Sequence, residues 1–227
     1  MQVKLPMKKL ILMFGLVLSA AFGYAQAYKT VKIDSLVSVS LPAVYTEKDT
    51  LGQQTFSAPA SFGFIVVTRI PNATNNTPLK KEKDLKNVFK NYVKDVAQVG
   101  NGTILNERDT TVGALKGHLF TLRTDDGNGN TQFRKFLFLY TQDVSYTFQY
   151  FYDDIRADFI KADVKNYYSS IKVSPDLQRN DQYLATSSDS GSGLFGISQI
   201  ALYGGGVVVI LIIIFVTVRR KRNVVSI

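Results

Sequence analysis

FRKFLFLYTQDVSYTFQYFY, residues 133–152, is the stretch that decides the fold. Residues 133–140 and 144–152 are rich in the aromatic and aliphatic side chains that favour strands, and Thr141-Gln-Asp143 between them predicts a turn. We therefore expect an antiparallel hairpin in which the even-numbered residues of both strands share one face. That wide aromatic face would contain Phe136, Phe138, Tyr140, Val144, Tyr146, Phe148, Tyr150 and Tyr152.

Further strands are predicted before this hairpin, where apolar residues recur at two-residue spacing between turn signals. The first covers residues 31–41, as one strand or as two joined at a kink near Ser35. The others are expected at residues 53–58, 62–70, 103–108 and 115–124. Short turns join most of these strands, which favours antiparallel pairing over parallel crossover units.

Two helices interrupt the strands. Apolar residues at i, i+3, i+4, i+7, i+8 and i+11 predict an amphipathic helix over residues 83–99, ended by Gly100 and Gly102. A second helix is expected over residues 156–171, with an inward face of Phe159, Ile160, Val164, Tyr167, Tyr168 and Ile171. The fold class is therefore α+β, an antiparallel sheet flanked by helices. One domain is expected at residues 28–174, followed by a flexible linker at 175–199.

This order of elements resembles the PsbP-like fold family over residues 30–173. The matching features are a first strand ending in Leu41-Pro42, the helix at 83–99, Gly113-Ala-Leu-Lys-Gly117 before a long strand, the aromatic hairpin, and a last helix ending in Tyr168-Ser-Ser-Ile171. The resemblance implies an α/β/α sandwich. Known members include an extrinsic subunit of photosystem II, a Ran-binding factor and many bacterial exported proteins. Because these roles differ, the fold alone selects no function, and no site residue is carried over.

The C-terminus predicts a membrane anchor. Residues 200–218 carry no charge and would form a helix of roughly 28 Å, close to the thickness of a bilayer core. Arg219-Arg-Lys-Arg222 follows at once and predicts that the tail, residues 219–227, lies in the cytoplasm. A buried helix of a soluble domain is the alternative. A second alternative is a sorting signal processed near Gly204-Gly-Gly206, which would release the domain or attach it to the surface.

The N-terminus predicts a secretory signal at residues 1–25. Lys4, Lys8 and Lys9 precede a twelve-residue apolar run at 10–21, and small residues allow cleavage after Ala25 or Ala27. An uncleaved N-terminal anchor is the alternative. Together the two ends predict a single-pass protein of the cell membrane with most of its chain outside the cytoplasm.

The charge and cysteine counts argue against a nucleic-acid-binding protein and against a disulfide-stabilised protein. The net charge is +9, but residues 28–218 hold 20 Lys and Arg against 18 Asp and Glu, since the signal and tail carry the other cations. A nearly neutral domain does not indicate a nucleic-acid partner, whereas the basic tail suits anionic headgroups. With no cysteine, the domain has no disulfide framework.

The candidate reactive residues all have plain structural interpretations, and we expect no catalytic residue, metal site or cofactor. His118 is the only histidine, and no Gly-x-Ser-x-Gly motif accompanies it. Asp126-Gly-Asn-Gly-Asn130 begins like a calcium loop but has Thr131 and Leu137 where such a loop needs Gly and Glu, so a hairpin loop is expected. Asp153-Asp154 are expected near a helix start, and Lys80–Lys86 as a solvated helix start or, alternatively, a basic patch that binds a partner.

These observations favour a non-catalytic interaction or assembly domain that is held at the outer face of a membrane and binds an unidentified extracytoplasmic protein. A hydrolase, or a domain that binds a small ligand or lipid, remains an alternative. Either would require a concave pocket with converging polar groups.

Overall fold

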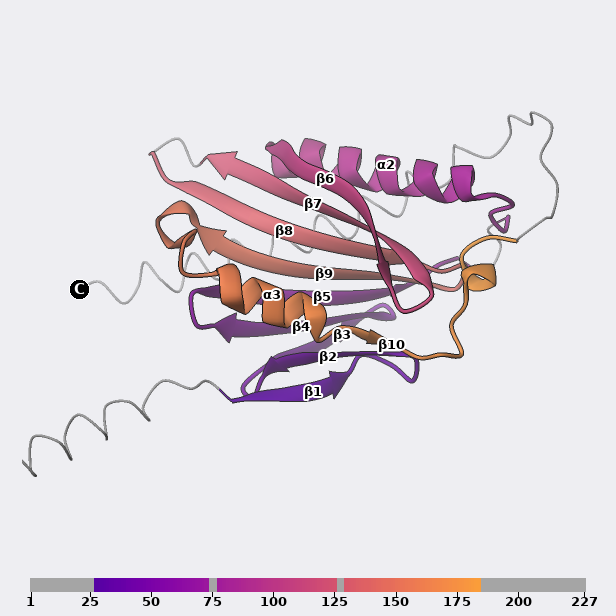
Figure 1. The fold of residues 1–227 in the computed structure, drawn as a ribbon, viewed down its shortest axis with the longest axis horizontal. Helices are drawn as coiled ribbons and strands as arrows, with labels where there is room; N and C mark the ends of the chain where they lie inside the picture. The colour runs from indigo at the N-terminus through magenta and orange to yellow at the C-terminus, as the bar shows by residue number, and fades with distance from the viewer. Residues whose placement is uncertain (1–26, 74–76, 126–128, 185–227) are drawn as a thin grey trace, which may run out of the picture.

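The computed structural model describes residues 27–73, 77–125 and 129–184. Its elements, labelled in Figure 1, are β1 (Tyr28–Lys32), β2 (Val37–Pro42), β3 (Thr46–Thr50), β4 (Gln53–Ala60), β5 (Gly63–Pro71), α2 (Glu82–Gly100), β6 (Thr103–Val112), β7 (Leu115–Asp125), β8 (Thr131–Tyr140), β9 (Val144–Asp153), the 3-10 helix η1 (Asp154–Arg156), α3 (Lys161–Ser169), β10 (Lys172–Val173) and the 3-10 helix η2 (Arg179–Asp181).

The strands form two antiparallel sheets. The large sheet has seven strands in the order β3-β4-β5-β9-β8-β7-β6, so that two meanders meet where β5 pairs with β9. The small sheet has the order β1-β2-β10. The antiparallel α+β fold with two helices that the sequence predicts is therefore confirmed.

Both faces of the large sheet are covered. Phe136 and Phe138 of β8 pack with residues of α2, such as Phe89 and Val93. Leu137 and Leu139, on the opposite face of the same strand, join the core beneath α3 and the small sheet. In Figure 1, α2 and α3 accordingly lie on different sides of the sheet. A strand buried on both faces needs a continuous apolar run, as residues 136–140 provide.

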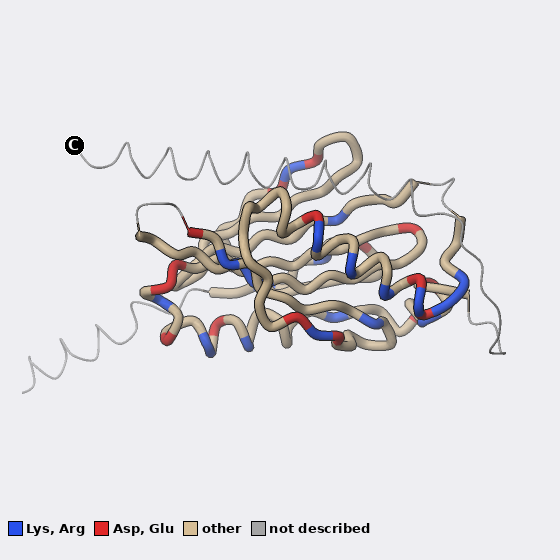
Figure 2. The backbone as a smooth tube through the Cα atoms, turned by 90° about the horizontal axis from the view of Figure 1, so that it is seen from above, with Lys and Arg blue, Asp and Glu red and all other residues tan. Residues whose placement is uncertain are grey.

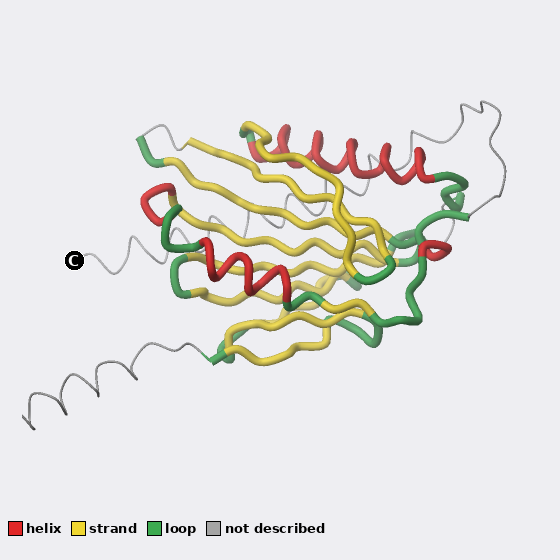
Figure 3. Tube along the Cα trace, in the orientation of Figure 1, coloured by secondary structure: helices red, strands yellow, loops and turns green. Residues whose placement is uncertain are grey.

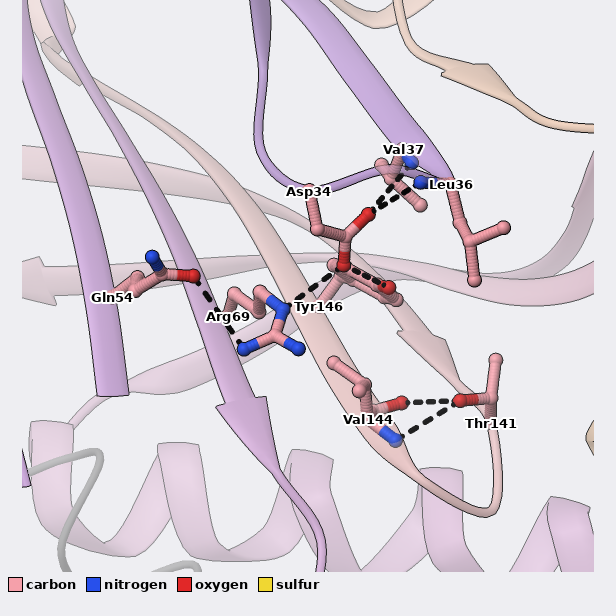
Figure 4. Close-up of polar contacts among 8 residues, drawn as sticks. All are labelled: Asp34, Leu36, Val37, Gln54, Arg69, Thr141, Val144 and Tyr146. Atoms are coloured by element: carbon pink, nitrogen blue, oxygen red, sulfur yellow. Dashed lines mark hydrogen bonds and ion pairs between the residues drawn. The ribbon is translucent and has the colours of Figure 1, made fainter. Parts of the chain in front are cut away.

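The predicted common face of the hairpin is wrong, because the turn is one residue shorter than expected. The Thr141 N–H donates to the Val144 carbonyl at 2.9 Å, so only Gln142 and Asp143 form the loop. The Thr141 hydroxyl also donates to that carbonyl, at 2.9 Å, and accepts the Val144 N–H at 3.0 Å (Figure 4). An even loop length pairs even-numbered residues with odd ones, as for Phe138 with Thr147. The even-numbered aromatic residues of β8 and β9 therefore lie on opposite faces.

Helix α2 follows the predicted pattern. Its buried residues are Leu85, Val88, Phe89, Val93 and Val96, all on one stripe. At its start the Asp84 carboxylate accepts the backbone N–H groups of Lys80 and Lys81. It ends at Asn101, which takes the left-handed conformation with φ of 46°.

The second predicted helix, at 156–171, is shorter in the structure. Residues 154–156 form η1, and α3 covers only Lys161–Ser169. The buried residues Ile160, Val164, Tyr167 and Ile171 follow i, i+4, i+7 and i+11 spacing. Phe159 lies about 100° around the helix from Ile160 and is exposed, contrary to its predicted inward position.

The region 31–41 covers parts of two strands, β1 and β2, which pair as a hairpin around residues 33–36; this agrees with the predicted alternative of two strands joined near Ser35. Two further segments differ from their predicted extent. Strand β3 was not predicted, because its sequence TEKDT lies wholly exposed at a sheet edge and has no apolar alternation. Residues 175–184, placed by the sequence at the start of the linker, instead pack on the domain and bury Leu177, Gln182 and Tyr183.

The predicted signal (1–25), span (200–218) and tail (219–227) lie outside the described residues. Within the ranges that the structure describes, no helix is both long and apolar enough to cross a bilayer.

Candidate functional site

A patch of exposed apolar side chains lies at one end of the large sheet. Phe62, in the turn between β4 and β5, has 38% of its surface exposed, Ile155 of η1 has 84%, and Phe159 has 64%. The rings of Phe62 and Phe159 stack with their centroids 5.7 Å apart. Together with Ser61 and Arg156 these residues line an open cavity of about 420 Å³. Apolar side chains exposed in a group, rather than singly, indicate a contact surface.

The backbone around the patch is fixed by close packing. Gly63 follows Phe62 and lies against β9, where a Cβ would come within 2.2 Å of the Phe151 carbonyl oxygen. Only glycine permits this approach, which brings the β4–β5 turn next to η1. Figure 3 shows this turn and η1 at the same end of the sheet, with η2 at the other end.

The rim of the patch is polar. Asp154 and Asp158 are exposed beside it, and Lys161 lies 3.1 Å from Asp158 as a surface ion pair. Only Arg156 among the cavity-lining residues is charged. An apolar centre within a charged rim is the usual composition of a protein–protein contact.

The sequence did not identify this patch. The sequence predicts an inward position for Phe159 because this residue neighbours the apolar stripe of α3, and Ile155 stands alone among charged residues. The sequence contains one signal of the patch: Ile155 is an apolar residue within the charged run Asp153-Asp-Ile-Arg156, and it belongs to no helical stripe. Asp153 is the residue just before η1 and Asp154 is the first residue of η1, so both lie at a helix start as predicted, although the Asp153 side chain makes no capping hydrogen bond.

His118 lies on β7 between two carboxylates of β6. Its Nδ1 is 2.8 Å from an Asp109 oxygen and its Nε2 is 3.0 Å from a Glu107 oxygen. Its ring stacks on Phe89 of α2, with centroids 5.3 Å apart. Asp109 is the cross-strand partner of His118. Each ring nitrogen therefore faces a carboxylate oxygen of the neighbouring strand, which favours a structural role for this side chain.

We therefore expect His118 to stabilise the packing of α2 on the edge of the sheet. Replacing it with glutamine (H118Q) should lower the free energy of unfolding by about 1–2 kcal/mol, through loss of one carboxylate contact and of the ring stack. Urea unfolding of the full chain in non-ionic detergent, followed by circular dichroism, measures this. Arg123→Gln on the same strand removes only an exposed ion pair and should change it by less than about 0.5 kcal/mol. Equal midpoints for H118Q and the unsubstituted protein would contradict the assignment.

Asp34 is the centre of a second polar cluster (Figure 4). Its Oδ2 accepts hydrogen bonds from Arg69 Nε at 2.9 Å and from the Tyr146 hydroxyl at 2.6 Å. Its Oδ1 accepts the backbone N–H groups of Leu36 and Val37, both at 2.8 Å. Burial alone would raise the pKa of Asp34, but these four hydrogen bonds outweigh it and hold the pKa below its ordinary value. Through Arg69 and Tyr146, these hydrogen bonds connect the β1–β2 turn to β5 and β9.

The remaining sequence candidates do not meet at a site. Lys80 and Lys81 directly precede α2 and residues 82–86 begin it, so this run lies at a helix start as predicted. Positions 126–128 of the predicted hairpin loop lie outside the described residues. Within the part of the chain that the structure describes, no three His, Asp or Glu side chains gather as metal ligands.

Comparison with known proteins gives similarity in structure only. No protein-family model matches the chain, and no curated protein matches it. A crystal structure from Bacteroides thetaiotaomicron VPI-5482 is similar with a TM-score of 0.40 and 10% identity, over 67% of this chain and 50% of that one. The match thus spans half the length of the Bacteroides chain. The solution structure of cyanobacterial PsbP from Synechocystis sp. PCC 6803 is similar with a TM-score of 0.44 and 15% identity, over 67% of this chain and 95% of that one. The likeness to PsbP that the sequence predicts is thus found among solved structures.

Proposed function

We propose that this chain is a single-pass membrane protein whose extracytoplasmic domain is a non-catalytic interaction or assembly module. The observation that carries the proposal is the exposed patch of Phe62, Ile155 and Phe159. Exposing these side chains to water is unfavourable, and covering them with a partner removes that cost.

The lining of the cavity suits binding better than chemistry. The guanidinium of Arg156 offers hydrogen-bond donors and no acceptor. Ser61 is the only hydroxyl in the lining, and no residue of the lining could act as a base to activate it. The cavity can therefore accept an apolar side chain of a partner, while Arg156 and the acidic rim orient its polar neighbours.

The two ends of the sequence support the location. The signal at 1–25 would direct the chain out of the cytoplasm, and the span at 200–218 with Arg219–Arg222 would retain it in the membrane. The partner is then an extracytoplasmic protein that the anchored domain meets at the membrane surface.

A photo-crosslinking amino acid at position 155 of the full chain, in native membranes, tests the patch. We expect a discrete adduct from position 155, and about tenfold less of it when Phe159 is replaced with serine, because central apolar contacts dominate interface energies. Phe159 is exposed, so F159S should leave the fold intact.

Position 51 provides the matched control. Leu51 is fully exposed in the turn at the opposite end of β4, and a crosslinker there should give no such adduct. Equal adducts from positions 51 and 155, or an adduct that F159S does not reduce, would contradict the proposed binding role.

A further inference from the structure

Four lysines form a straight ridge along the outer face of α2. Lys83, Lys86, Lys90 and Lys94 are spaced three or four residues apart, so they lie on one side of the helix, opposite its buried stripe. All four are exposed. In Figure 2 the backbone tube of α2 is blue at successive turns of the helix. We call Lys83, Lys86, Lys90 and Lys94 the lysine ridge.

The acids of α2 do not neutralise the ridge. Asp84 is bound to backbone N–H groups at the helix start, and Glu82 lies 2.6 Å from Lys116 and 3.5 Å from Lys86. From Leu85 to the end of α2 the only acid is Asp95. Among the described residues, Lys86 is the only member of the ridge in an ion pair, and that pair is exposed and weak.

The chain leaves the domain beside this helix. The N–H of Leu184, the last described residue, donates to the carbonyl of Leu79 at 2.8 Å, just before α2 begins. Tyr183 packs in the same cluster as Leu85 and Phe89 of α2. Only residues 185–199 separate this point from the predicted span at residue 200. A flexible chain of that length reaches about 20 Å on average, so the anchor would keep α2 close to the bilayer.

We propose that the lysine ridge rests on the surface of the membrane that anchors the chain, in contact with anionic phospholipid headgroups. The inference depends on the proposed anchor and adds an orientation to it. Each cation near an anionic surface contributes attraction, and the short connection supplies a high local concentration of lipid. With the ridge on the membrane, α3 on the other side of the sheet faces away from it.

Fluorescence quenching in nanodiscs tests this orientation. The chain has no cysteine, so a single Asn87→Cys beside the ridge can carry a fluorophore, and lipids with a headgroup quencher report its distance from the bilayer. We expect quenching roughly fivefold or more stronger in phosphatidylcholine with phosphatidylglycerol than in phosphatidylcholine alone, and sensitive to salt. A label at Asn166→Cys, exposed on α3, should be quenched weakly in both.

Two sets of charge variants distinguish the effect of the lysine ridge from the effect of the net charge of the domain. Replacing all four ridge lysines with glutamine should abolish the effect of phosphatidylglycerol on the label at position 87. Replacing Lys32, Lys161, Lys165 and Lys172, which are exposed on β1, α3 and β10, removes the same charge and should leave the effect intact.

Three outcomes would overturn the inference: equal quenching at positions 87 and 166, quenching that ignores phosphatidylglycerol, or equal losses in both variants. The inference would also be overturned if the label at position 87 became shielded only when an acidic protein was added, because the ridge would then bind that protein and not lipid. Failure of the chain to enter nanodiscs would instead reject the anchor, so the two failures are distinguishable.

Discussion

Replacing Asp34 with asparagine should lower the free energy of unfolding by about 2–3 kcal/mol at neutral pH. The change removes the charge that pairs with Arg69 and weakens the bonds from Tyr146 and from the two backbone N–H groups. Tyr146 is buried, so its hydroxyl has no access to water in exchange. This expected loss is smaller than the loss on breaking a fully buried ion pair, because the side chains of Asp34 and Arg69 keep 17% and 23% of their surface exposed.

The same carboxylate makes the stability of the domain depend on pH. Its pKa is lower in the folded protein than in the unfolded chain. Its contribution is therefore complete above the unfolded pKa, near 4, and is lost as the pH falls through the folded pKa. The stability difference between the unsubstituted protein and D34N should shrink as the pH is lowered below about 4.

Urea unfolding of the full chain in non-ionic detergent, at neutral pH and through the acid range, measures both effects. Asp158→Asn is the matched control, because Asp158 is exposed and holds only a surface ion pair with Lys161. That variant should differ by less than about 0.5 kcal/mol. A D34N chain as stable as the unsubstituted protein at neutral pH would show that the cluster does not fasten the β1–β2 turn.

The sequence predicts those features that depend on one element alone. Helix α2 is recognisable because its buried residues repeat with the helical period and because two glycines mark its end, Gly100 as its last residue and Gly102 just beyond it. Strands β4, β5, β7, β8 and β9 are recognisable from their apolar content. Strand β3 is not, because an exposed edge strand has no apolar face to give a period.

Features that depend on contacts between elements could not be predicted. The cluster at Asp34 joins residues far apart in the chain, and no motif links Asp34 to Arg69 and Tyr146. The bonding of both His118 nitrogens depends on the register of β6 against β7, which shifts between Leu105 and Arg108. The apolar patch depends on where η1 ends and α3 begins, and adjacent apolar residues at 159 and 160 do not reveal which of them is buried.

The patch and the lysine ridge give the domain two different contact surfaces. The patch lies at the end of the sheet with the β4–β5 turn, whereas η2 and the exit of the chain lie at the other end (Figure 3). A domain resting on α2 would therefore keep Phe62, Ile155 and Phe159 away from the point of attachment. Covering the patch with a protein and the ridge with lipid are then compatible, since neither surface hides the other.

The register of the aromatic hairpin gives the largest expected effect. Leu139 is completely buried, lies opposite Tyr146, and fills the space above Gly117 in the core beneath α3 and the small sheet. Replacing it with alanine should lower the free energy of unfolding by about 2–5 kcal/mol, the usual cost of a leucine-sized cavity. If Leu139 lay at the surface instead, the same substitution would change the free energy of unfolding by less than about 0.5 kcal/mol.

Leu139→Val keeps the measurement possible if the alanine variant does not fold, with an expected loss of about 1 kcal/mol. Leu51→Ala, at a fully exposed leucine, is the control and should change the free energy by less than about 0.5 kcal/mol. The same urea titration measures all three variants. Near-equal midpoints for Leu139→Ala and Leu51→Ala would contradict the burial of Leu139 against Gly117 and Tyr146. A large difference is the expected result, because Leu139 is completely buried and Leu51 is fully exposed.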